Sequence, residues 1–163
     1  MPTLETVRAH VSRYCEMYRH PNLEKLSLSQ VYSLVAGVGE PPRQATQAPS
    51  AAPHQDQEAS PPFGWPGTWP NSGEPGVYLV FDTAMNLLYV GKASMSNGIG
   101  ARLNGHFGYA TDGTRGCAPR GTWSAPPAYV VAIGVPHSFE APALEEYLIL
   151  ELQPPDNVRG KAG

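Results

Sequence analysis

Two tyrosines stand at matching places in two short segments of the chain, GVY at 76–78 and YVG at 89–91. The ten residues between Tyr78 and Tyr89 contain an apolar stretch, a turn with Asp and Asn, and a second apolar stretch. This pattern is typical of a β-hairpin, so the sequence predicts two phenols on neighbouring strands. Tyr is a good strand residue in its own right, but phenols paired in this way also suit chemistry on a phosphate group.

Two cations and a histidine follow the second tyrosine. Lys92 comes directly after the YVG segment, where a chain that leaves a strand can bring a positive charge to a phosphate. Arg102 and His106 are four residues apart in a predicted helix, so both project from one helical face. The guanidinium suits bidentate contact with phosphate and keeps its charge, whereas the imidazole can transfer a proton or only form a hydrogen bond. Each of these residues alone is more often an ordinary surface or structural residue.

A carboxylate lies on the apolar stripe of the last predicted helix. At roughly 100° per residue, four apolar side chains of this helix share one arc: Leu144, Leu148, Ile149 and Leu152. Glu145 falls inside that arc, whereas Glu146 points away from it. A carboxylate among apolar side chains must be protonated, paired or bound to a metal ion; the alternative is a carboxylate at the helix margin that reaches water. Asn157, just past the helix, reads by itself as a turn residue.

The ordered set of these positions resembles the GIY-YIG nuclease family. GVY and YVG stand for the two halves of the family name, and the stretch 145–157 looks like the family's E-x-x-L-I…P-x-x-N ending. The other matching positions are Lys92, Arg102 and His106, the last where members often carry His or Tyr. The resemblance covers about residues 76–157, half of the chain. It departs in a slightly longer segment between Gly91 and Arg102, and residues 1–75 have no counterpart in the family pattern.

The resemblance implies hydrolysis of a DNA phosphodiester bond with one divalent cation per active site, Mg²⁺ or Mn²⁺. Glu145, rather than Glu146, would be the single direct protein ligand of the ion, with water and a phosphate oxygen in its other positions. Arg102 would hold the same phosphate from another side, so that guanidinium and metal form an electrostatic clamp. Lys92 would bind phosphate as well.

The resemblance also implies roles for the remaining site residues. Tyr78 would position or deprotonate the attacking water, and His106 is either the alternative proton acceptor or the group that orients Tyr78. A free tyrosine has a pKa of about 10, so Tyr78 needs a nearby positive charge or a relay for its proton. Tyr89 would hydrogen-bond at the attacked phosphate or water, and Asn157 would brace the site from behind.

Three interpretations follow. The leading hypothesis is a metal-dependent DNA endonuclease. A second is a GIY-YIG-shaped module that binds DNA or protein without cutting, although the intact set of site residues speaks against a decayed site. A third is an unrelated α/β interaction protein that carries the two tyrosines by coincidence, but it would leave an inward-facing Glu145 without a use.

The periodicities around these residues predict a mixed α/β (α+β) fold. The expected strands are 77–81, 87–90 and 129–133, and the expected helices are 99–107 and 142–152. The domain that they form, residues 76–163, is expected to be a small three-stranded, mainly antiparallel sheet flanked by helices, and GIY-YIG-like. A loop at 109–127 is rich in Gly, Thr and Pro, and loops of that length in small domains are usually functional or disordered.

Residues 1–38 read as a helical N-terminal arm. One helix carries apolar residues at helical spacing from Leu4 to Tyr18, and a second begins at the capping-box pattern of 27–30. Such a pair is too small to bury a core of its own, so it must dock on the rest of the chain, on a second copy or on a partner. We hypothesise a homodimer contact or a protein partner through residues 1–36.

Two further segments join the arm to the domain. Residues 39–62 consist mainly of Pro, Ala, Gln and Ser with almost no apolar bulk, which predicts a disordered linker. Residues 63–75 begin with three aromatic residues among prolines and glycines. This segment is expected to form a strap packed along the following domain, with a peptide-like docking site as the alternative.

Composition sets broader limits. The chain has 163 residues and a formal net charge of −3, so it is not as a whole a polycation that seeks nucleic acid. Residues 91–124 nevertheless carry four cations and one acid, a local excess that suits a few phosphates. Two cysteines do not make a disulfide framework, and no apolar leader or membrane-length run occurs. A cytoplasmic location without membrane contact is therefore expected, with DNA as the partner.

Overall fold

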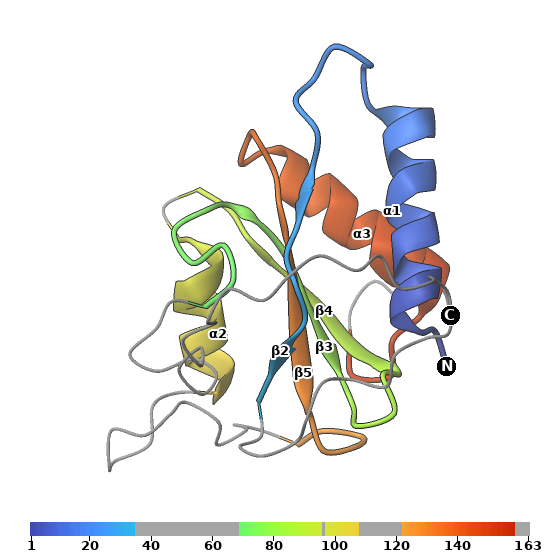
Figure 1. The fold of residues 1–163 in the computed structure, drawn as a ribbon, viewed down its shortest axis with the longest axis vertical. Helices are drawn as coiled ribbons and strands as arrows, with labels where there is room; N and C mark the ends of the chain where they lie inside the picture. The colour runs from blue at the N-terminus through green and yellow to red at the C-terminus, as the bar shows by residue number, and fades with distance from the viewer. Residues whose placement is uncertain (35–68, 96, 108–121, 159–163) are drawn as a thin grey trace, which may run out of the picture.

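The computed structural model of the chain describes residues 1–34, 69–95, 97–107 and 122–158. In chain order its elements are α1 (Leu4–Tyr18), β1 (Ser27–Leu28), β2 (Tyr32–Ser33), β3 (Gly76–Phe81), β4 (Leu87–Ala93), α2 (Ile99–Phe107), β5 (Tyr129–Gly134) and α3 (Glu140–Leu152). The strands form one antiparallel sheet in the order β1-β5-β3-β4, with β2 also paired to β5. Helices cover both faces, α1 and α3 on one and α2 on the other (Figure 1). The mixed α/β prediction is confirmed for the described residues.

The hairpin of β3 and β4 forms the centre and one side of the sheet. β3 pairs with β4 along one edge and with β5 along the other, both in antiparallel register. The turn between the two strands is held by the Asp82 carboxylate, whose Oδ1 accepts hydrogen bonds from the backbone N–H groups of Ala84 (2.9 Å) and Asn86 (2.8 Å). Such Asx contacts are what Asp supplies in tight turns. The predicted hairpin is therefore confirmed.

The prediction of a second helix in the N-terminal arm is wrong. Residues 27–28 and 32–33 are instead the short strands β1 and β2, so the described sheet has five strands rather than the three expected. Ser29 N–H donates to the Ala132 carbonyl (2.8 Å), and Ala132 N–H donates to Ser29 Oγ (2.9 Å). The outer edge of β5 would otherwise present unpaired backbone groups. Hydrogen bonding to these backbone groups outweighs the helix preference of residues 27–33, because local propensity is weak and tertiary contacts override it.

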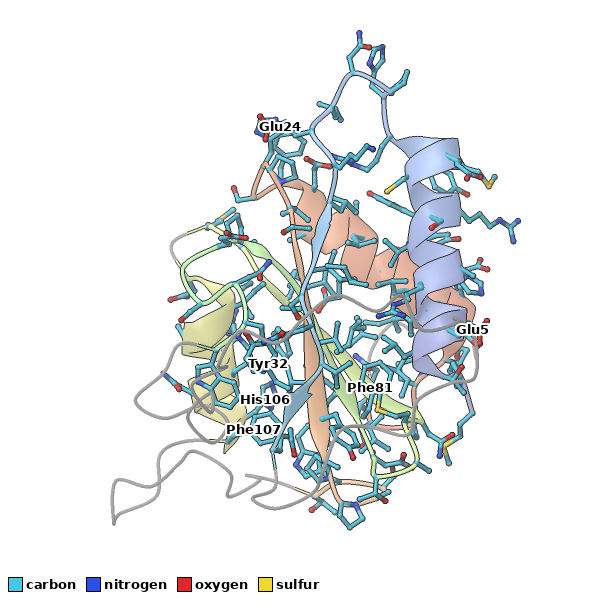
Figure 2. The ribbon with its side chains drawn as sticks, in the orientation of Figure 1. Glu5, Glu24, Tyr32, Phe81, His106 and Phe107 are labelled. Carbon is cyan, nitrogen blue, oxygen red and sulfur yellow. The ribbon has the colours of Figure 1, made fainter. Side chains whose placement is uncertain are left out.

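The face of the sheet under α1 and α3 holds the larger core. β3 alternates, so that Val77, Leu79 and Phe81 point to this side, and Figure 2 shows the Phe81 side chain there. α1 contributes Leu4, Val7 and Tyr14, and α3 contributes Leu144, Leu148, Ile149 and Leu152. The arm therefore docks on the rest of its own chain, one of the three alternatives left open by the sequence. Contact with a second copy or a partner through residues 1–36 stays a prediction.

An ion pair ties the end of the arm to the start of α3. Arg19 Nε lies 2.6 Å from Glu140 Oε2, and both side chains are nearly buried, at 7% and 6% exposed. A hydrogen bond to this carboxylate raises the pKa of Arg19. Removal of one member of a buried pair leaves an uncompensated charge. The contact therefore holds residues 1–34 to the sheet layer in addition to the apolar core.

The opposite face of the sheet packs against α2. Tyr78 and Val80 of β3 point to this side and meet Leu103 and Phe107 of α2; Figure 2 places His106 and Phe107 on the same helix. Trp69 is also buried here: its Nε1 donates to Asn104 Oδ1 at 2.5 Å, and its ring centroid lies 5.9 Å from that of Phe107. The described end of the predicted strap thus packs on the domain. Residues 63–68 and the predicted linker at 39–62 lie outside the described residues.

The two main helices end close to where the sequence predicted. α2 begins and ends at the expected residues, and α3 begins at Glu140, two residues before the expected start. α3 ends at Leu152, and the next residue, Gln153, has a left-handed backbone (φ 47°) and closes the helix with a hydrogen bond from its N–H to the Ile149 carbonyl. In the part of the chain that the structure describes, no helix is both long and apolar enough to cross a membrane.

Candidate active site

A cleft of about 450 Å³ opens at the outer edge of β4, the last strand of the sheet. Its lining residues are Tyr78, Tyr89, Lys92, Ala101, Arg102, Gly105, His106 and Glu145. They come from β3, β4, α2 and α3, so the cleft exists only when all four elements are packed together. Six of the seven site residues predicted from the sequence line this one cleft.

The two phenols lie on the same face of the hairpin. Tyr89 is paired with Val80 and Tyr78 with Gly91, so the rings are diagonal neighbours with centroids 6.1 Å apart. A Cβ added to Gly91 would collide with the outer end of the Tyr78 ring and would lie 2.7 Å from Cε1 of Tyr89. Glycine at this position therefore leaves the space in which the Tyr78 ring crosses β4 and reaches the cleft.

A hydrogen bond links the first phenol to the histidine of α2. Tyr78 Oη lies 2.9 Å from His106 Nε2, and the tautomer of the ring decides which atom donates. Burial, followed by the nearby Tyr89, raises the pKa of Tyr78 above its ordinary value. Burial and the positive charge of Arg102 lower the pKa of His106. Both groups are thus neutral near pH 7, and a His106 with its proton on Nδ1 accepts a hydrogen bond at Nε2 from the Tyr78 hydroxyl.

The carboxylate predicted from the helix arc does face the cleft. The Glu145 side chain is 13% exposed and forms an ion pair with Lys92 Nζ through Oε2. Glu146, the next residue, is not part of the cleft wall, as the helical geometry predicted. Lys92 itself remains 35% exposed in its side chain, so its ammonium stays close to water and can exchange partners.

The guanidinium of Arg102 forms another wall of the cleft. Arg102 is exposed on α2, one helical turn before His106. Burial raises the pKa of Tyr89, and the positive charge of Arg102 acts across the cleft in the opposite direction. Arg102 on α2 and Lys92 on β4 thus bring two positively charged side chains to the cleft, which suit a phosphate group.

The donor set of the cleft fits a hard divalent cation held by one protein ligand. Within the described ranges, no group of three or more His, Cys, Asp or Glu residues could form a cage around a metal ion. Mg²⁺ does not require a cage, because it keeps several waters and binds through one or two carboxylates together with substrate phosphates. Glu145 supplies one carboxylate at an open, polar cleft. A cation there would compete with Lys92 Nζ for that carboxylate.

The chain matches no protein-family model, no curated protein and no solved structure. The chemistry of the cleft therefore has to be inferred from its own side chains and from the way in which the fold brings them together. A carboxylate, a guanidinium, an ammonium, an imidazole and two phenols share its walls.

Asn157, the seventh predicted residue, does not line this cleft and lies against the outer edge of β4. It is 5% exposed, its Oδ1 accepts from Val90 N–H (2.8 Å) and its Nδ2 donates to the Val90 carbonyl (2.7 Å). The adjacent Asp156 N–H donates to the Leu88 carbonyl (3.0 Å). The side chain thus pairs with the outer edge of β4 between Tyr89 and Lys92, an arrangement consistent with the bracing role expected for it.

Sequence reasoning did not single out Trp123. Its ring is edge-on to Tyr89 (centroids 6.0 Å apart), 5.9 Å from the His106 ring, and stacked on Phe107 at 5.8 Å. These contacts restrict the rings of Tyr89 and His106, which both line the cleft. The available signal was an aromatic residue near the end of the predicted 109–127 loop, shortly before a strand. Residues 109–121 of that loop lie outside the described part.

Replacement of Asn157 by alanine should lower the free energy of unfolding by about 2 kcal/mol, because it leaves the buried N–H and carbonyl of Val90 without partners. Urea titration followed by circular dichroism measures the change. Val158→Ala, at a neighbouring side chain that is 91% exposed, is the matched control and should stay within about 0.5 kcal/mol of wild type. Equal stability of the two variants would contradict the bracing role.

Proposed function

We propose that this protein is a metal-dependent DNA endonuclease that hydrolyses phosphodiester bonds at a single-metal site of the GIY-YIG type. One observation carries the proposal: residues spread from position 78 to position 145 meet in a single cleft with the side-chain chemistry that phosphoryl transfer needs. The family resemblance of the sequence supports the same proposal, because the same residues carry it.

Binding of the scissile phosphate is assigned to the cationic side chains. Arg102 and Lys92 stand on different walls of the cleft, so that they can contact different oxygens of one phosphate. Glu145 is the residue that would hold the divalent cation. When bound, that cation neutralises the charge that develops on the phosphoryl and leaving oxygens.

Proton transfer is assigned to the hydrogen-bonded pair of Tyr78 and His106. Because the pKa of Tyr78 is raised, very little of its phenolate form exists at neutral pH to act as a base. A relay avoids that difficulty: the water gives its proton to Tyr78 Oη as Tyr78 passes its own proton to His106 Nε2, at a separation of 2.9 Å. The imidazole ends protonated, the phenol is unchanged, and the hydroxide attacks phosphorus as the bond from phosphorus to the ester oxygen of the leaving strand breaks. That oxygen then takes a proton from the water at the open cleft. Direct acceptance of the proton by His106 is the alternative route, with Tyr78 as the group that orients the water.

One observation favours a second candidate, a module that binds DNA or protein without cutting. Lys92 is paired with Glu145, and a carboxylate neutralised in this way no longer repels a phosphate. Arg102 would then bind the backbone without any metal ion. The two functions differ in their need for a divalent cation, and this difference decides between them.

Incubation of the purified protein with supercoiled plasmid and Mg²⁺ or Mn²⁺ should convert the plasmid to nicked and linear forms. EDTA should abolish the conversion, because the proposed reaction depends on the ion to neutralise the charge that develops on the phosphate. Gel electrophoresis measures both results. Retardation of intact plasmid without any conversion in either metal would favour the binding module instead.

A further inference from the structure

A second hollow of about 710 Å³ adjoins the cleft and shares Tyr89, Lys92 and Glu145 with it. The remaining walls of this hollow, here named the flanking groove, come from α3 and the segment that follows α3. Those residues are Glu146, Ile149, Leu150, Asp156, Asn157 and Val158. A substrate held in the cleft therefore lies directly beside the flanking groove, with a common wall between them.

The chemistry of the flanking groove differs from that of the cleft. Its rim exposes two apolar side chains, Leu150 at 55% and Val158 at 91%. It adds two carboxylates, Glu146 and Asp156, and among its described lining residues Lys92, shared with the cleft, is the one cation. Asp156 Oδ1 accepts from Ser124 N–H at 3.0 Å, whereas its Oδ2 is buried and has no hydrogen-bond partner in the described part of the chain.

These walls reject a phosphate and suit a nucleobase. Two carboxylates repel an anion, and exposed aliphatic side chains offer it no hydrogen bond. A nucleobase presents an apolar face to Leu150 and Val158, and its amino and imino groups donate hydrogen bonds to the exposed carboxylate of Glu146 in the groove wall. The volume of the groove, about 710 Å³, lies in the range of ordinary small-molecule sites.

We propose that the flanking groove binds an unpaired nucleobase next to the scissile phosphate. The inference rests on the proposed nuclease function and names its substrate class: DNA strands with an unpaired nucleotide beside the cleavage site, such as mismatched or single-stranded DNA. A paired base in a stacked duplex faces its partner strand, so it must leave the stack to enter a pocket beside the backbone. A nucleotide that is already unpaired avoids most of that cost.

Continuity with the cleft selects this occupant over a basic peptide, which acidic walls would also attract. A strand with its phosphate at Lys92 and Arg102 has to continue over one of the neighbouring surfaces. The flanking groove shares three residues with the cleft, so the next nucleotide of the same strand reaches it without leaving the protein surface.

The test compares labelled oligonucleotide duplexes of one sequence that differ at a single nucleotide beside the mapped cleavage site. One is fully paired, one carries a mismatch, and one carries an abasic site; each change is placed on either side of the scissile phosphate in turn. With Mg²⁺ we expect the mismatched duplex to be cleaved about tenfold faster than the paired duplex, because its base enters the groove without first breaking a base pair. The abasic duplex, which is flexible but has no base at that position, should lose this advantage.

Two variants connect the preference to the groove. Leu150→Ala removes an apolar wall, and Glu146→Gln replaces one oxygen of the exposed carboxylate in the groove wall by a donor. Each should reduce the mismatch advantage to about threefold or less. Met17→Ala, at an apolar side chain on α1 that is 56% exposed, is the matched control and should leave the advantage unchanged.

Binding in EDTA provides a readout that needs no cleavage. Fluorescence anisotropy should show tighter binding of the mismatched than of the abasic duplex, with the difference reduced in Leu150→Ala. Lack of cleavage of every duplex with Mg²⁺ and Mn²⁺ would refute the nuclease function, and the binding comparison would still decide the role of the groove. Equal binding and equal cleavage of paired, mismatched and abasic duplexes would overturn the base site. Polylysine serves as the probe for a basic peptide. If the wild-type protein bound it and the two variants did not, while the DNA preference stayed unchanged, the groove would be a peptide site and not a base site.

Discussion

Glu145→Gln should reduce metal-dependent plasmid nicking by about 1000-fold or more, while the chain stays folded. The substitution keeps the shape of the side chain but removes the negative charge, and with it the one protein carboxylate assigned to the cation. The several kcal/mol of transition-state stabilisation that a metal ion supplies correspond to a loss of this size. Initial rates of nicking at saturating Mg²⁺ measure the effect.

The matched control is Glu151→Gln, on the same helix. Glu151 is exposed and faces α1, where Oε2 lies 3.7 Å from His10 Nδ1, so its loss should leave the nicking rate unchanged. The stability of Glu145→Gln should also change by less than about 1 kcal/mol, because its partner Lys92 is close to water. Nicking at the wild-type rate in Glu145→Gln would remove the basis for a metal site at this cleft.

Tyr78→Phe should lower the rate of cleavage by about 100- to 1000-fold with little change in DNA affinity. It deletes only the hydroxyl that lies 2.9 Å from His106 Nε2 and keeps the ring that packs against α2. Loss of a positioned proton-transfer group typically has an effect of this order. Single-turnover cleavage measures the rate, and fluorescence anisotropy in EDTA measures the affinity.

Tyr14→Phe serves as the control for the loss of a phenolic hydroxyl. Tyr14 is buried in the core under α1, on the opposite face of the sheet from Tyr78, so its hydroxyl cannot reach the cleft. A wild-type cleavage rate in Tyr78→Phe would exclude the relay and leave direct acceptance of the proton by His106. His106→Gln should cause a large loss by either route, because Gln retains hydrogen bonding without accepting a proton.

The elements that carry the site were predicted from the sequence because their signals are strong and local. The hairpin has apolar strands on both sides of an Asp- and Asn-containing turn, and α3 has an apolar arc with one carboxylate inside it. The direction of Glu145 followed from that arc alone, since the geometry of a helix fixes where each side chain points.

The rest depended on contacts between distant segments, which local patterns do not specify. Residues 27–30 carry a capping-box pattern, yet residues 27–28 and 32–33 pair with β5, because that strand would otherwise have an open edge. The ion pair of Lys92 with Glu145 and the position of Trp123 against His106 likewise require the relative placement of β4, α2 and α3. Gly91 could be identified as part of the motif, but its role as the space for the Tyr78 ring emerges only with the register of the hairpin.

The docking of residues 1–34 on the sheet limits where this chain can be truncated. A fragment trimmed to the stretch that carries the family resemblance, 76–157, would lose α1 from the larger core and the partner of the nearly buried Glu140. It would also uncover the outer edge of β5, which could then recruit strands from other molecules. We therefore expect the smallest fragment that folds on its own to need residues 1–34 as well as the sheet and helices that follow, and a graft of this cleft onto another protein to need its N-terminal segment too.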